Sequence, residues 1–174
     1  RVLFRSQLLK QSVSSLKGEK LKPRVDVRVV LDFLDSSPAG EPAEQDDLHE
    51  TGTGSARRSA TATLPHRYIP EARQRIDIYR KLAQATDKLQ LEGLRKELRD
   101  LFGPLPPSVE LLLAVGELKV LGAEKGVTSI EVESDKLKLT RNNDFITLGG
   151  KFPRLTKKDA AGRLKEIKRL LLAL

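Results

Sequence analysis

Apolar residues recur at helical spacing through the middle of the chain and predict three consecutive helices. Pro70, Asp87 and Pro107 mark the expected starts, because these residue types are favoured at the first positions of a helix. The second and third helices should end at Gly103 and Gly126, since glycine readily adopts the left-handed conformation of a helix cap. Short connections favour antiparallel neighbours. The stripes expected to face inward are, helix by helix, Ala72, Ile76, Tyr79 and Ala83; Leu91, Leu94, Leu98 and Leu101; and Val109, Leu112, Leu113, Val115 and Val120.

Beyond the third helix the apolar period shortens to two, which predicts strands. Residues 127–140 form a hairpin, residues 145–148 add a strand, and residues 25–34 alternate in the same way. A last helix follows, where Thr156 and Asp159 resemble a capping box. Its inward stripe is Ala160, Leu164, Ile167 and Leu171. The predicted fold class is therefore α+β, with three antiparallel helices, a small antiparallel β-sheet and a C-terminal basic helix.

The first 65 residues differ from the rest of the chain. Residues 1–24 end in a helical pattern, and we interpret them as the remnant of a helix whose body is missing. Residues 1–6 match the translation of a sequencing adapter, so we interpret them as an artefact, with an ordinary helix start as the alternative. Residues 25–65 are interpreted as an extended linker, in which residues 36–59 form a disordered insertion because they hold too few large apolar side chains to offset ordering. Residues 66–174 form the main domain.

Composition removes several kinds of chemistry. The chain has no cysteine and two histidines, which excludes disulfides, Cys-based zinc sites and thiol catalysis. The phosphate-binding glycine motifs G-x-x-x-x-G-K-[ST] and G-x-G-x-x-G are both absent from the sequence. We interpret Ser108 and Thr156 as helix caps rather than nucleophiles. We therefore expect no catalytic, cofactor or metal site in this chain. No apolar run approaches the roughly 20 residues of a membrane span, so we expect a cytoplasmic location and no membrane partner.

Positive charge is concentrated at the end of the chain. The net charge is +8, and residues 134–174 hold 11 basic and 4 acidic residues. Aromatic residues make up only 4% of the chain, which disfavours nucleic-acid binding by stacking. A solvated face or a protein partner is favoured, and direct nucleic-acid contact is the alternative. The candidate basic face comprises Lys157, Lys158, Arg163, Lys165, Lys168 and Arg169.

The first predicted helix carries three arginines that form a second candidate surface. Arg73 and Arg80 are seven residues apart and share a face, whereas Arg75 lies on another. Solvated i,i+4 pairs, such as Arg73 with Asp77, are one interpretation, and a specific anion or carboxylate site is the other.

Several linked motifs resemble a known family. Tyr68-Ile-Pro is followed by an R-x-x-x-Y-R pattern at 75–80, then by Phe-Gly-Pro-Leu-Pro at 102–106 and a leucine-rich helix. This combination resembles the C-terminal domain of the bacterial transcription-repair coupling factor, closely over 68–133 and more loosely to residue 174. Residues 7–35 resemble the end of that family's motor region and the link that leaves it, which makes the N-terminal remnant a piece of a motor-domain helix. The insertion departs from the family's pattern, since it is longer than a typical linker.

The resemblance implies a parent protein that is an ATP-driven DNA translocase, which displaces stalled RNA polymerase and recruits nucleotide-excision repair. ATP and Mg would be cofactors of that parent, and RNA polymerase, the excision-repair protein UvrA and duplex DNA its partners. The C-terminal domain would be a regulatory, autoinhibitory clamp on the N-terminal repair-recruiting module. The expected partner interface comprises Arg73, Arg75, Arg80, Phe102 and Pro104. A nucleic-acid-binding module that uses the basic last helix and a ligand-free packing domain are the alternatives.

Overall fold

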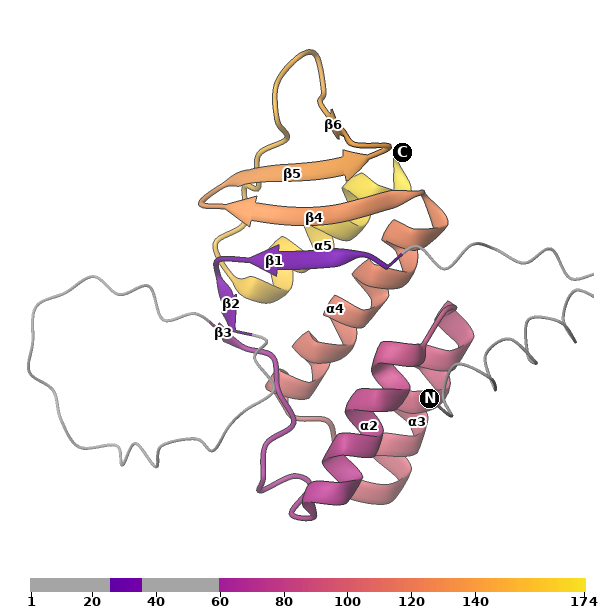
Figure 1. The fold of residues 1–174 in the computed structure, drawn as a ribbon. Coiled ribbons are helices and arrows are strands. Elements are labelled where there is room, and N and C mark those ends of the chain that lie inside the picture. Colours follow the sequence, from indigo (N-terminus) through magenta and orange to yellow (C-terminus); the bar gives the residue numbers. More distant parts are fainter. Residues whose placement is uncertain (1–25, 36–59) are drawn as a thin grey trace, which may run out of the picture.

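Figure 1 shows a computed structural model of the chain, which describes residues 26–35 and 60–174. The interpretations of residues 1–24 as a helix remnant and of residues 36–59 as a disordered insertion concern segments outside these residues. The division of the chain into domains therefore stays a prediction.

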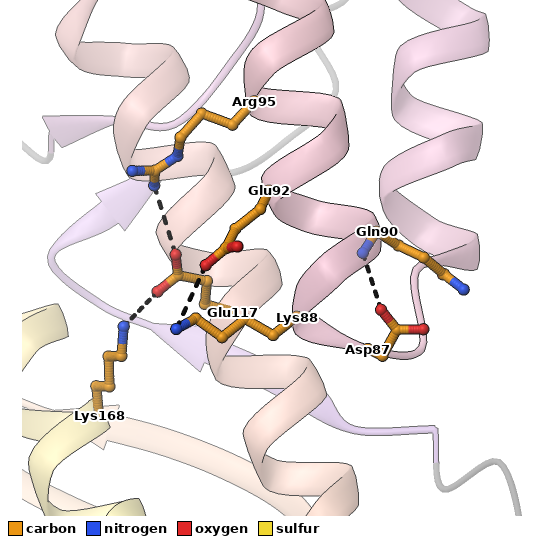
Figure 2. Close-up of polar contacts among 7 residues, drawn as sticks. All are labelled: Asp87, Lys88, Gln90, Glu92, Arg95, Glu117 and Lys168. Carbon is orange, nitrogen blue, oxygen red and sulfur yellow. Dashed lines mark hydrogen bonds and ion pairs between the residues drawn. The ribbon is translucent and has the colours of Figure 1, made fainter.

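Three successive helices follow one another in the chain with reversing direction (Figure 1). They are α2 (Ala72–Gln84), α3 (Lys88–Phe102) and α4 (Pro107–Glu124). Asp87 caps α3, because its carboxylate accepts a hydrogen bond of 2.8 Å from the Gln90 backbone N–H (Figure 2). Gly103 and Gly126 have φ angles of 84° and 69°, where a side chain would be strained. The predicted ends of the second and third helices are confirmed.

Four strands form the main sheet in the order β1-β4-β5-β6. They are β1 (Arg28–Leu31), β4 (Val127–Glu133), β5 (Lys136–Arg141) and β6 (Asp144–Ile146), and α5 (Ala160–Leu172) follows them. The β4–β5 and β5–β6 pairs are antiparallel, which confirms the predicted hairpin. The α+β class is also confirmed.

The described parts of the segment interpreted as a linker, residues 26–35 and 60–65, take part in this core. Strand β1 pairs with β4 in parallel, so the sheet is mixed rather than purely antiparallel. Val27 and Leu31 are buried in the core. Two further short strands, β2 (Leu34–Asp35) and β3 (Ala60–Thr61), pair in parallel where the chain leaves and re-enters the described residues.

Helix α4 is central, because it packs against α2, α3, α5, β1 and β4. Such a helix must be apolar on most of its circumference. Two glycines permit the closest approaches. A Cβ on Gly116 would lie 2.7 Å from Leu82 Cδ1, and one on Gly122 would lie 3.1 Å from Val27 Cγ1. These contacts bring α2 against the middle of α4, and the residue before β1 against the last turn of α4.

The predicted inward face of α2 is wrong except at Tyr79, which is half-buried against the core. Ile76 is 56% exposed and Ala72 and Ala83 are exposed, whereas Ile78 is buried. The helix is rotated relative to the predicted face because Leu82, which is larger than Ala72 or Ala83, packs against the backbone of Gly116. In α3 the predicted stripe holds except at its end, where Leu101 is 66% exposed in the last turn of the helix.

Two predicted caps are also wrong. Asp159 caps α5 by accepting a 2.7 Å hydrogen bond from Gly162 N–H, whereas Thr156 lies before the helix. Ser108 lies inside the first turn of α4, after Pro106 at the N-cap, because Pro107 already satisfies the first helical position. The predicted inward stripe of α5 is otherwise confirmed, with its leucines and isoleucine buried.

Candidate partner-binding surfaces

Tyr68 joins the Tyr-Ile-Pro motif to the Phe-Gly-Pro-Leu-Pro motif at one corner of the helical part. Its hydroxyl lies 3.0 Å from the carbonyl oxygens of both Leu98 and Gly103, which share its single proton. Its ring lies 5.8 Å from the Phe102 ring in a tilted arrangement. Burial raises the pKa of Tyr68, and the Arg99 charge offsets part of that rise. The corner is therefore fixed to the end of α3.

Arg75 holds the same corner from the other side. Its Nη1 donates hydrogen bonds of 2.7 Å to the Ile69 carbonyl and 2.9 Å to the Pro70 carbonyl. A half-buried guanidinium that satisfies two loop carbonyls positions the start of α2. Arg75 thus lies away from the exposed face, as the sequence predicted, but it is engaged within the fold.

The exposed face of α2 carries Arg73, Ile76 and Arg80. Arg80 pairs with Asp77 at 2.8 Å, whereas the sequence suggested that Asp77 would pair with Arg73. The Arg80 and Asp77 side chains are 60% and 61% exposed, so this pair contributes less than about 1 kcal/mol. Arg73 is exposed and has no ion pair within the described residues. Of the other predicted interface residues, Pro104 is exposed and Phe102 is half-buried against Tyr68.

The predicted basic face does not lie on one side of α5. The Arg163 guanidinium lies 5.0 Å from the Phe33 ring centroid and donates 2.9 Å hydrogen bonds to the carbonyls of Lys157 and Ser134. Lys168 pairs with Glu117 of α4. Both side chains are half-buried because they tie α5 to the sheet and to α4. The exposed cations that remain are Lys157, Lys158, Lys165 and Arg169.

Glu166 holds the loop that precedes α5. Its carboxylate accepts hydrogen bonds of 2.9 Å and 3.0 Å from the backbone N–H groups of Thr156 and Lys157, and another from the Thr156 hydroxyl. Burial raises the pKa of Glu166, but these bonds outweigh burial and lower it overall. Neither Glu166 nor Tyr68 was a sequence candidate, because bonds between residues ten or thirty apart leave no local pattern.

The described residues contain no group of side chains arranged to hold a metal ion. Within the same part of the chain, no helix is long and apolar enough to cross a membrane.

Consecutive helices fixed by corner contacts, followed by a small sheet and a last helix, define a small α+β domain. The sequence model of the TRCF domain matches residues 59–147, which is half of the chain. The chain belongs to the TRCF domain family.

The relatives agree with this assignment. The chain is 33% identical to the transcription-repair-coupling factor of Bacillus subtilis (strain 168) over 79 residues, which cover 45% of this chain and 7% of the relative. It is 30% identical to that of Escherichia coli (strain K12) over 98 residues, which cover 56% and 8%. The chain thus matches less than a tenth of the length of these proteins.

A solved structure gives the same result. A crystal structure of the C-terminal domain of a transcription-repair coupling factor superposes with a TM-score of 0.52 and 26% identity, covering 64% of this chain and 87% of that chain. The resemblance expected from the motifs is confirmed.

Proposed function

We propose that this domain is the autoinhibitory clamp of an ATP-dependent DNA translocase that displaces stalled RNA polymerase and recruits nucleotide-excision repair. Support comes from membership of the TRCF family and from relatives named transcription-repair-coupling factors. In the proposal, the domain covers the N-terminal repair-recruiting module of its own parent. ATP and Mg, RNA polymerase, UvrA and duplex DNA belong to that parent.

The exposed face of α2 is the observation that carries the proposed contact. Ile78 is buried beneath the helix, and the Tyr79 hydroxyl accepts a 3.0 Å hydrogen bond from Leu64 N–H. The helix is therefore fixed before any partner arrives. Arg73 and Ile76 on its outer side can then bind a partner at low ordering cost, with the guanidinium directed at a carboxylate.

The arginines do not test this proposal equally. Arg75→Glu would place a carboxylate beside two carbonyl oxygens and disturb the corner, so a loss of binding would be ambiguous. Arg73→Glu and Arg80→Glu change exposed charges and leave the corner intact. They are the informative variants, and Lys96→Glu on the exposed side of α3 is a matched control.

The test titrates the isolated N-terminal module of the parent against the domain by calorimetry. We expect Arg73→Glu to weaken binding about tenfold, since loss of a charge pair at an interface costs about 1–2 kcal/mol. In the full-length parent the same change should raise basal ATPase activity. If binding and ATPase activity both stay at the parental level while circular dichroism shows an intact fold, this face of α2 is not the contact with the N-terminal module.

The net charge of the last 41 residues supports nucleic-acid binding as a second candidate function. Within the candidate basic face, Arg163 and Lys168 are engaged elsewhere, so four exposed cations remain for phosphate. Binding of duplex DNA should then show a slope of log affinity against log salt of about −3.6, or about −0.9 per phosphate contact. A flat salt dependence would exclude this function.

A further inference from the structure

A groove of about 430 Å³ runs between α4 and α5, and it is not part of the α2 face. Leu111, Ala114 and Leu118 from α4 form one side of its floor, and Leu164 from α5 forms the other. The α4 residues lie three and four positions apart, so they make a continuous apolar stripe. Because α5 lies beyond residues 59–147, the family match does not include one wall of the groove.

Charged side chains line the groove unevenly. Arg95, Lys165 and Lys168 supply three positive charges, whereas Glu110 and Glu117 supply two negative charges. Glu110 and Glu117 are two helical turns apart, about 10 Å along α4. Glu110 stands in the first turn of α4, near Pro107. The cations Arg95 and Lys168 meet at Glu117, so the positive end of the groove lies away from the start of α4.

Figure 2 shows how the positive end is built. Glu117 projects from α4 between two cations from other helices, with Lys168 Nζ at 2.6 Å from Oε2 and Arg95 Nη2 at 3.4 Å from Oε1. The Glu117 side chain is 19% exposed, whereas those of Arg95 and Lys168 are each 38% exposed. One carboxylate thus serves two cations, and the contact with Arg95 is long.

These cations keep unused hydrogen-bonding capacity. A guanidinium has five N–H donors and an ammonium has three, and within the described residues each group makes one side-chain contact, to the same carboxylate. Lys165, on the α5 wall, has no ion pair within that part of the chain. A second carboxylate could therefore be accepted without removing the first.

We propose that this groove binds an acidic amphipathic helix of a partner protein, whose leucines fill the apolar floor and whose carboxylates meet Arg95, Lys165 and Lys168. The wall from Pro107 to Leu118 is about 16 Å long, which fits about three turns of helix. Three cations against two carboxylates favour an acidic partner, and the apolar floor favours a helix with leucines over nucleic acid, whose phosphates cannot fill it. Apolar anchors at helical spacing are the usual way in which a groove selects a helix.

The probe for the test is a fluorescein-labelled synthetic helix of two heptads, with leucines on one face and glutamates on the other. Binding to the full 174-residue chain is measured by fluorescence anisotropy. We expect Lys165→Glu to weaken binding about tenfold. Arg169→Glu, an exposed charge on the same helix that does not line the groove, should change it less than about twofold. Methyl signals of Leu111 and Ala114 should shift on binding.

Glu117→Gln separates this proposal from a purely structural role. The Glu117 charge repels the carboxylates of the probe, so its neutralisation should strengthen binding severalfold while the domain becomes slightly less stable. A probe with lysine in place of glutamate should bind at least about tenfold more weakly. Equal binding of both probes, an unchanged affinity in Lys165→Glu, or Lys165-dependent binding of a labelled DNA oligonucleotide in place of the acidic probe would each overturn the proposal.

Discussion

The helical part of this domain and its sheet part are held together over different distances in the sequence. Helices α2, α3 and α4 are consecutive, and the corner bonds of Tyr68 span 30 and 35 residues. In the sheet part, Arg28 of β1 is the partner of Ser129 of β4, and the Asp32 carboxylate accepts a hydrogen bond from Ser134 N–H across 102 positions. The helical part therefore closes shorter loops than the sheet part, where the β1–β4 pairing joins segments that are far apart in the sequence.

Removal of β1 should have the largest effect, and it tests the pairing of β1 with β4, which joins residues far apart in the sequence. A chain that begins at residue 36 lacks Val27, Leu31 and Leu34, all of which are in the core. Loss of each large core side chain costs about 2–5 kcal/mol, and a typical domain is stable by about 5–15 kcal/mol. We expect no cooperative thermal unfolding transition. A chain that begins at residue 25 is the control and should unfold as the parent does. Equal melting temperatures would show that β1 is dispensable.

The rotation of α2 can be tested with two isoleucines of the same helix. Ile78 is 6% exposed and Ile76 is 56% exposed. Ile78→Ala should lower the free energy of unfolding by about 2–4 kcal/mol, because it leaves a cavity. Ile76→Ala should change it by less than about 0.5 kcal/mol. Urea denaturation measures both values. A larger loss for Ile76→Ala than for Ile78→Ala would mean that the face predicted from the sequence packs inward.

Helices α2 and α3 show how much of the fold the sequence specifies. Helix α3 has leucines at a single helical spacing, and its buried side chains Leu91, Leu94 and Leu98 follow directly from it. Helix α2 has isoleucines two positions apart, so two faces are nearly equally apolar. The packing of Leu82 at Gly116, together with the Tyr79 and Arg75 hydrogen bonds to the preceding loop, selects one of them. The sequence thus predicts that both segments are helices, but it does not predict which face of α2 packs against the core.

The candidate surfaces show the same division between residue type and position. The sequence places Arg73, Arg75 and Arg80 on one helix but does not say which guanidinium will satisfy loop carbonyls. The bonds of Arg75 depend on the turn at Ile69 and Pro70. The groove could not be predicted, because its two walls come from segments that are far apart in the chain.

Glu166→Gln should have an intermediate effect, confined to the sheet part. It weakens the bonds that hold the loop before α5, at a cost of about 1–2 kcal/mol at pH 7. Because the folded pKa of Glu166 lies below its ordinary value of 4.5, the charged carboxylate stabilises the fold above that pH and less as pH falls through the folded pKa. The deficit of the variant should therefore shrink in acid. Glu124→Gln, an exposed position, is the control, and a deficit that stays constant from pH 7 to pH 3 would contradict this role.

Tyr68→Phe should have the smallest effect, in the helical part. The ring contact with Phe102 remains while the hydroxyl bonds to Leu98 and Gly103 are lost, which costs about 1 kcal/mol at neutral pH. The folded pKa of Tyr68 is raised above its ordinary value of 10.0, so its contribution is present below that pH and is lost as pH rises through the folded pKa. Urea denaturation between pH 7 and pH 11 should show the gap between parent and variant narrow above pH 10. A gap that is absent at pH 7 would mean that water replaces the hydroxyl without cost, and the corner would then be held by Arg75 and by packing alone.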